Sequence, residues 1–152
     1  MAPVIPLVAQ AMTTRIIFYS GSRDKLLTAC RLCAKAVQQN MGMLVYVPDA
    51  QVRDELDKLL WTFSATSFVA HCDIRDDDLI AMTPVVLTDK MVTDTKFTAL
   101  LNLHQHCPPD YECFERLIEI AGEVDQDKQA ARERYRYYKE AGHEIQHYDL
   151  TD

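Results

Sequence analysis

Residues 14–47, TRIIFYSGSRDKLLTACRLCAKAVQQNMGMLVYV, contain the alternation of strand and helix patterns from which the fold class follows. A β-branched and aromatic run at residues 14–19 is typical of a strand, and the SGS that follows at 20–22 marks a turn. Between residues 24 and 39, apolar side chains recur at steps of three and four, which predicts a helix with one buried side. The continuous apolar run at residues 43–47 predicts a strand covered on both faces. This succession predicts an α/β domain, because parallel strands need helical crossovers.

The remainder of the chain continues the alternation. The expected elements are a helix at residues 48–61, strands at 67–70, 84–87 and 98–103, a loop over the acidic residues 73–78, and helices at 111–122 and 125–141. We therefore predict a single α/β domain over residues 12–152. Its mainly parallel sheet is flanked by helices, with a topology like that of nucleotide-binding proteins.

Composition narrows the class of protein. A chain of 152 residues with 48% apolar side chains can form a core without disulfides or metal. The formal net charge of −7 argues against broad electrostatic binding of nucleic acid and leaves room only for a local basic patch. We expect no sequence-specific DNA binding, and no apolar run approaches the length of a membrane span.

The ends of the sequence and its cysteines suggest a location. Residues 1–11 are apolar, but Pro3 and Pro6 interrupt them and no basic residue precedes them, so a signal peptide is not expected. We interpret them as a disordered N-terminal extension, with Met12 as the native start. The five cysteines are an odd number, which favours reduced thiols and a cytoplasmic protein.

Residues 143–147 read HEIQH and match the zinc-binding pattern H-E-x-x-H. In that pattern two histidines one helical turn apart bind zinc, and the glutamate acts as a base. His143, Glu144 and His147 therefore keep a zinc hydrolase open as an alternative function. The motif follows Gly142 and lies close to the end of the sequence, where a third ligand has little room, so a chance match is the simpler interpretation.

Other cysteine, histidine and aspartate groups have structural interpretations. Cys30 and Cys33 form a C-x-x-C pair on the apolar side of the predicted helix, and we expect small buried residues rather than a redox pair. The group at residues 104–107 with Cys113 fits no structural zinc spacing and is interpreted as a surface loop. The aspartates within residues 73–78 lack the glycine and closing glutamate of a calcium loop. No metal site or cofactor is predicted.

The architecture leaves a small nucleotide-binding enzyme as a second alternative. Phosphate-binding loops use clustered glycines, which let the backbone approach the phosphate closely. The four glycines here are isolated, and neither G-x-G-x-x-G nor G-x-x-x-x-G-K-[ST] occurs. We therefore expect a nucleotide-binding-like fold without a phosphate-binding loop.

Charge is distributed unevenly along the chain. Residues 128–139 contain five basic side chains and one acidic one, so this stretch is +4 and the remainder is −11. Helical spacing places on one face the residues Lys128, Arg132, Tyr135, Arg136 and Lys139. Such a face is either a solvated cationic helix end or a receptor for an acidic peptide that carries an aromatic side chain. In the second case arginine forks bind carboxylates and the tyrosine ring forms the wall of an apolar slot.

Residues 131–138, ARERYRYY, with the following Ala141-Gly142, resemble the C-terminal signature of the chi subunit of bacterial DNA polymerase III. Leu60-Trp61 with SFVAH at residues 67–71, and TRIIFY at residues 14–19, resemble earlier segments of the same family. The resemblance covers about residues 12–142. It implies an α/β fold without nucleotide chemistry and a non-catalytic adaptor associated with the clamp loader.

The resemblance also implies two partners, the psi subunit of DNA polymerase III and the acidic C-terminal tail of the single-stranded DNA-binding protein. Carried over to this sequence, the tail pocket consists of Arg132, Tyr135 and Arg136, with Lys139 expected to contact acidic residues of the tail. Arg136 stands where a lysine is usual in the family, which keeps the charge and adds a planar fork.

The psi interface implied by the resemblance lies at Phe68, with Trp61 beside it. Psi is expected to connect the chain to the clamp loader, while the tail pocket connects it to single-stranded DNA-binding protein.

Overall fold

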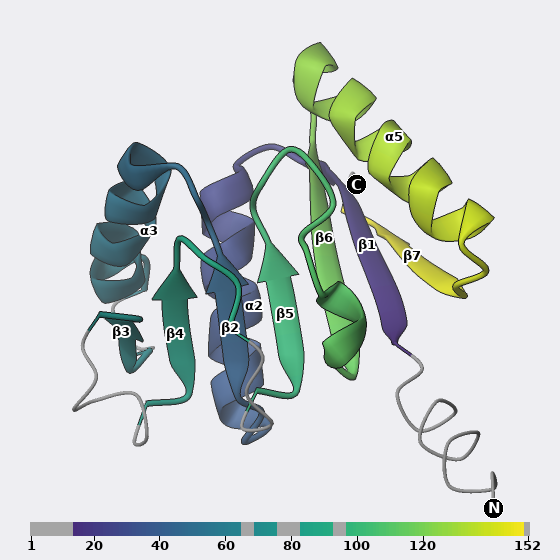
Figure 1. The fold of residues 1–152 in the computed structure, drawn as a ribbon. Coiled ribbons are helices and arrows are strands. Elements are labelled where there is room, and N and C mark those ends of the chain that lie inside the picture. The colour runs from purple at the N-terminus through teal and green to yellow at the C-terminus, as the bar shows by residue number, and fades with distance from the viewer. Residues whose placement is uncertain (1–13, 65–68, 76–82, 93–96, 151–152) are drawn as a thin grey trace, which may run out of the picture.

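The computed structural model describes residues 14–64, 69–75, 83–92 and 97–150 (Figure 1). Their strands are β1 (Arg15–Ser22), β2 (Met43–Tyr46), β3 (His71–Asp73), β4 (Val85–Thr88), β5 (Ala99–Asn102), β6 (Arg116–Gly122) and β7 (Ile145–Asp149). They form one sheet in the order β3-β4-β2-β5-β6-β1-β7, in which each neighbouring pair is parallel. The helices are α2 (Lys25–Gln38), α3 (Ala50–Thr62) and α5 (Asp125–Glu140), with a short 3-10 helix at Tyr111–Cys113. The predicted α/β fold with a parallel sheet is confirmed.

Helices cover both faces of the sheet. Figure 1 shows α2 and α3 on one face and α5 on the other. Strand side chains alternate between two apolar cores accordingly: Val45 packs with the buried residues of α2 and α3, whereas its neighbour Leu44 packs with Ala131 and Tyr138 of α5. The strands read as apolar runs because both of their faces are buried.

Two aspartates begin the first two helices. Asp24 accepts a hydrogen bond from the Leu27 backbone N–H at 3.1 Å, and Asp49 accepts one from Gln51 at 2.9 Å. These N-caps satisfy amide groups that have no partner within the helix. The predictions of helices at residues 24–39 and 48–61 are therefore confirmed, with ends that differ by one or two residues.

The predicted helix at residues 111–122 is wrong. A 3-10 turn at Tyr111–Cys113 is followed by strand β6, which lies between β5 and β1 in the sheet. Leu117 packs on the α5 side of the sheet and Ile118 on the α2 side. A strand that is buried on both faces has no polar side, so its apolar residues imitate the spacing of a helix.

Two further boundaries differ from prediction. The strand expected at residues 67–70 is observed at His71–Asp73, and residues 65–68 lie outside the described part of the chain. Asp73, which was expected in a loop, is the last residue of this strand, while residues 76–82 are not described. The N-terminal extension at residues 1–11 likewise lies outside the described residues.

The C-x-x-C pair lies inside the core. Cys30 and Cys33 are fully buried on the inner side of α2, as predicted. Burial raises the pKa of Cys30 to about 12 and also raises that of Cys33, so both thiols are protonated at neutral pH. No helix in the described part of the chain is long and apolar enough to cross a membrane.

Candidate functional sites

A groove of about 410 Å³ lies between α5 and the carboxyl ends of β1, β6 and β7. Ligands of parallel α/β sheets commonly bind at such strand ends. Lys128, Arg132 and Tyr135 line the groove from the helix, and Ser20 and His147 line it from the strands. We call this the α5 groove.

The α5 groove gathers part of the predicted tail site. Arg132 and Tyr135 are among its lining residues, as is Lys128 from the same predicted face. Arg136 and Lys139 are exposed on α5 and lie outside the lining. The structure thus brings two of the four predicted site residues into the groove and leaves the other two cations on the helix surface beyond it.

Tyr135 forms an aromatic wall of the groove. Its ring meets that of Phe18 edge to face, with centroids 5.3 Å apart, and Phe18 also lines the groove. Phe18 is buried in β1, so the tyrosine is held by the core rather than projecting freely. The half-buried Tyr135 ring can contact an aromatic or aliphatic side chain of a ligand. The two cations beside it can bind a carboxylate of the same ligand.

Two glycines, Gly21 and Gly122, line the α5 groove at the strand ends. Gly21, at the end of β1, has a φ of 73°, a conformation that glycine adopts without strain, and the β1–β6 register shifts beside it. At Gly122 a Cβ would lie 3.0 Å from Asp127 Oδ2, which accepts a hydrogen bond from the Gly122 N–H. Asp127 also pairs with Lys25 at 2.9 Å, so the first turn of α5 is fixed against the strand ends.

A buried polar network that the sequence pattern did not predict lies beneath α5. The Arg134 Nε donates to Glu119 Oε1 at 2.9 Å, and the Tyr138 hydroxyl donates to Glu119 Oε2 at 2.6 Å. Asn102 donates to the same Glu119 oxygen at 2.9 Å. Burial raises the pKa of Glu119, and the charge of Arg134 opposes that rise. Arg134 therefore belongs to the core, and a glutamate within an otherwise apolar strand was the signal for it.

The histidines of the H-E-x-x-H pattern do not lie on a helix. Gly142, with a φ of 93°, ends α5, and His147 lies in strand β7, where its Nε2 is 2.6 Å from Ser20 Oγ. His143 Nε2 instead forms a hydrogen bond with the Tyr111 hydroxyl at 2.9 Å. The helical geometry that the zinc motif requires is absent here. Among the residues described, no group of three or more histidine, cysteine, aspartate or glutamate side chains is arranged to hold a metal.

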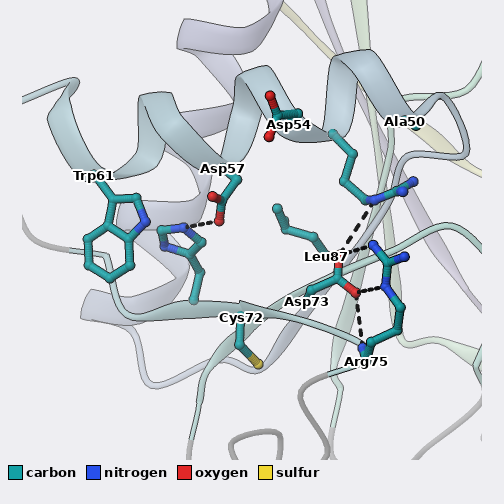
Figure 2. A pocket seen from close by; sticks show the side chains of 10 residues that line it. Ala50, Asp54, Asp57, Trp61, Cys72, Asp73, Arg75 and Leu87 are labelled. Carbon is teal, nitrogen blue, oxygen red and sulfur yellow. Dashed lines mark hydrogen bonds and ion pairs between the residues drawn. The ribbon is translucent and has the colours of Figure 1, made fainter.

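A second pocket, of about 490 Å³, lies at the opposite edge of the sheet between α3 and β3 (Figure 2). Trp61, which is 51% exposed, forms one end, with its ring centroid 4.6 Å from that of His71. His71 Nε2 is 3.0 Å from Asp57, and its Nδ1 is 2.7 Å from the Val69 carbonyl oxygen. We call this the Trp61 pocket. Phe68, the other predicted psi residue, lies outside the described part of the chain.

Comparisons with known proteins agree with this architecture. Residues 12–146 match the family described as DNA polymerase III chi subunit, HolC. The DNA polymerase III subunit chi of Pseudomonas aeruginosa is 33% identical over 141 residues, which cover 90% of this chain and 97% of that protein.

A solved structure of a variant Dbp5 C-terminal domain from S. cerevisiae, bound to Gle1 and IP6, superposes with a TM-score of 0.55. It is 9% identical and covers 89% of this chain and 90% of its own, so it shows a shared fold alone. The family match and the Pseudomonas relative decide against both enzyme alternatives, the zinc hydrolase and the nucleotide-binding enzyme. The chain belongs to the DNA polymerase III chi subunit family, whose members are non-catalytic accessory subunits in DNA replication.

Proposed function

We propose that this chain connects DNA polymerase III to single-stranded DNA-binding protein in the cytoplasm. The α5 groove receives the acidic C-terminal tail of that protein. The main support for this proposal is the composition of the groove. In a chain with a net charge of −7, it combines the cations Lys128 and Arg132 with the aromatic ring of Tyr135. That combination suits a peptide that carries both carboxylates and an apolar ring.

The four residues of the proposed tail site have distinct roles. Arg132 binds the terminal carboxylate of the tail, because its planar fork matches the two carboxylate oxygens. Tyr135 contacts the aromatic side chain of the tail. Arg136 and Lys139, exposed further along α5, attract the acidic residues that precede the end of the tail. Asp149 also lines the groove and opposes part of this positive charge.

The Arg132→Ala substitution tests the tail site. It removes a charge-assisted pairing worth about 1.5–3 kcal/mol, so we expect the Kd for a fluorescent tail peptide to rise about 10- to 100-fold. Fluorescence anisotropy at moderate salt measures the change. Lys58→Ala, which removes an exposed cation on α3, is the matched control and should leave the Kd unchanged. Equal affinity of wild type and Arg132→Ala would remove this assignment.

We further propose that the Trp61 pocket binds the psi subunit. Support comes from the half-exposed tryptophan at the rim of a concave surface, since tryptophans in such positions often dominate the binding energy of protein interfaces. In this arrangement psi and the tail bind at opposite edges of the sheet, which lets one chain hold both partners at once.

The Trp61→Ala substitution tests the psi site. Loss of this side chain is expected to cost about 2 kcal/mol or more, enough to dissociate a complex during gel filtration at micromolar concentration. The measurement is co-elution of the chain with its co-expressed psi subunit. Tyr137→Ala removes an equally exposed aromatic ring from α5 and should leave co-elution intact. Co-elution of the Trp61→Ala chain would show that psi binds elsewhere.

A further inference from the structure

A third concave surface, of about 310 Å³, lies on the face of the sheet opposite to α5, beside edge strand β7. It is lined by Arg15 and Tyr19 of β1, Arg116 of β6, Tyr148 of β7 and Lys35 of α2. We call it the basic groove. Neither the family match nor the proposed function assigns a role to it, and it shares no lining residue with the α5 groove.

The charge of the basic groove is uniformly positive. Its lining contains three cations and neither aspartate nor glutamate, in a chain whose net charge is −7. Arg15 and Arg116 are direct partners in the register of β1 and β6, so their side chains leave the same face of neighbouring strands about 4.8 Å apart. The two guanidinium charges repel each other. Such a pair is therefore a structural cost unless an anion lies between the two guanidinium groups.

The cations of this groove have no anionic partner within the described residues. None of the ion pairs among the described residues includes Arg15, Lys35 or Arg116. The Nε of Arg116 is buried in the groove wall and, among the described residues, makes no hydrogen bond. A buried donor without an acceptor is unfavourable, so the Arg116 guanidinium group would be stabilised by an anion that accepts its hydrogen bonds.

Two tyrosines continue the groove along the strands. The rings of Tyr19 and Tyr148 stack with centroids 5.3 Å apart and an angle of 22° between their planes. Tyr148 is 48% exposed on the edge strand, which leaves part of its ring open to solvent. A flat aromatic surface that is open to solvent next to cations suits a ligand that carries both phosphates and a planar base.

We propose that the basic groove binds single-stranded nucleic acid, with backbone phosphates on Arg15, Arg116 and Lys35 and an unpaired base stacked on Tyr148. Arg15 and Tyr19 are about 13 Å apart along β1, a span that several nucleotides fill more readily than one. A duplex keeps its bases stacked on each other and offers no base to the tyrosine. The basic groove lies on the face of the sheet away from α5, so the binding of nucleic acid there does not depend on tail binding.

The probe is a fluorescein-labelled oligo(dT) of about 20 nucleotides, longer than a typical ssDNA site. Anisotropy is measured between about 50 and 200 mM salt. If three phosphates are bound, a plot of the logarithm of the association constant against the logarithm of the salt concentration should have a slope of about −2, because each phosphate contributes about −0.7. Replacing both arginines, Arg15→Gln with Arg116→Gln, should weaken binding about tenfold or more and flatten the slope.

Two further variants separate this role from structural effects. Tyr148→Ala should lower affinity while leaving the salt slope unchanged, because stacking releases no counterions. Arg132→Gln, in the α5 groove, should bind oligo(dT) like the wild type while losing the tail peptide. The Arg15→Gln, Arg116→Gln chain should keep tail binding and should unfold at a temperature no lower than the wild type, because a like-charge pair has been removed.

The inference is overturned if the wild-type chain does not bind oligo(dT) at low salt. It is equally overturned if Arg132→Gln, rather than the arginine pair, abolishes oligo(dT) binding. Loss of tail-peptide affinity on replacing Arg15 and Arg116 would make the basic groove a peptide site instead. Equal affinity for a duplex of the same length, with no effect of Tyr148→Ala, would assign it to duplex backbone binding and also refute the proposal.

Discussion

Arg132 and Arg134 stand two residues apart on α5 and have opposite surroundings. Arg132 lines the α5 groove, whereas the Arg134 side chain is 2% exposed and pairs with the fully buried Glu119. The Arg134 guanidinium also donates to the Gln105 carbonyl oxygen at 2.8 Å, which ties the loop after β5 to the helix. One arginine is thus available to a partner, and the other fixes the helix on the sheet.

This contrast predicts different results for two alanine substitutions. Arg134→Ala leaves Glu119 buried without its charge partner and should cost about 3–5 kcal/mol of unfolding free energy. Arg132→Ala should change stability by about 0.5 kcal/mol or less, as is usual for exposed positions. Urea denaturation of both variants measures the difference. Similar stability of the two variants would contradict the role assigned to Arg134.

Asp73, which lines the Trp61 pocket, makes a pH-dependent contribution to the stability of the folded chain. Hydrogen bonds from Arg75, at 2.9 and 3.1 Å, hold the pKa of Asp73 below its ordinary value, with a smaller effect from the charge of Arg53. Because the pKa is lower in the folded chain, the stabilisation is fully present above the unfolded pKa of about 3.9. It is lost as the pH falls through the folded value.

The Asp73→Asn substitution tests this dependence. The variant should melt at a lower temperature than the wild type between about pH 5 and 7, where the carboxylate is ionised in both folded and unfolded chains. The difference in Tm should shrink as the pH falls towards about 3. Circular dichroism melts at several pH values give both curves. A difference that stays constant down to low pH would show that the charge of Asp73 is not responsible.

Helices α2 and α3 were predictable because the sequence features that specify them lie within each helix or directly before it. In α2 and α3 the aspartate caps and the three- and four-residue apolar steps lie within the element itself. The cationic face of α5 was predictable for the same reason. The helix also buries Arg134 and Tyr138, which sequence spacing alone does not reveal because their partner Glu119 lies on a distant strand.

Strands β6 and β7 were not predictable because their stability depends on neighbours. β6 is buried on both faces and contains a glutamate whose partners come from β5 and α5. β7 is short, mostly exposed and polar, so it carries little apolar signal, and its sequence coincides with a zinc motif. The strand conformation of β7 is stabilised by its parallel pairing with β1, which comes from the other end of the described chain. Consequently the wall of the α5 groove that contains Ser20 and His147 was also missed.

At the scale of the whole molecule, the two proposed partner sites lie at opposite edges of one sheet. The Trp61 pocket borders β3, and the α5 groove borders β7, with five strands between them. Six spacings between neighbouring strands separate the edges by about 29 Å. Figure 1 shows the corresponding helices, α3 and α5, at the two ends of the molecule.

This separation predicts independent binding. Sites that share no contacts generally couple by less than about 0.5 kcal/mol, so the psi-bound chain should bind the tail peptide with a Kd within about twofold of the free chain. Anisotropy titrations with the free chain and with the purified psi complex make the comparison. Mutually exclusive binding would show that the two partners use overlapping surfaces.

The position of β1 has a consequence for synthesis of the protein. β1 is made first among the described strands, yet its partners in the sheet are β6 and β7, near the other end of the sequence. During translation Ile16, Ile17 and Phe18 therefore remain without their strand neighbours until most of the nascent chain has left the ribosome. Contacts so distant in sequence slow folding and leave apolar segments open to aggregation. The sheet can therefore close only after β6 and β7 have been synthesised, and not during growth of the first half of the chain.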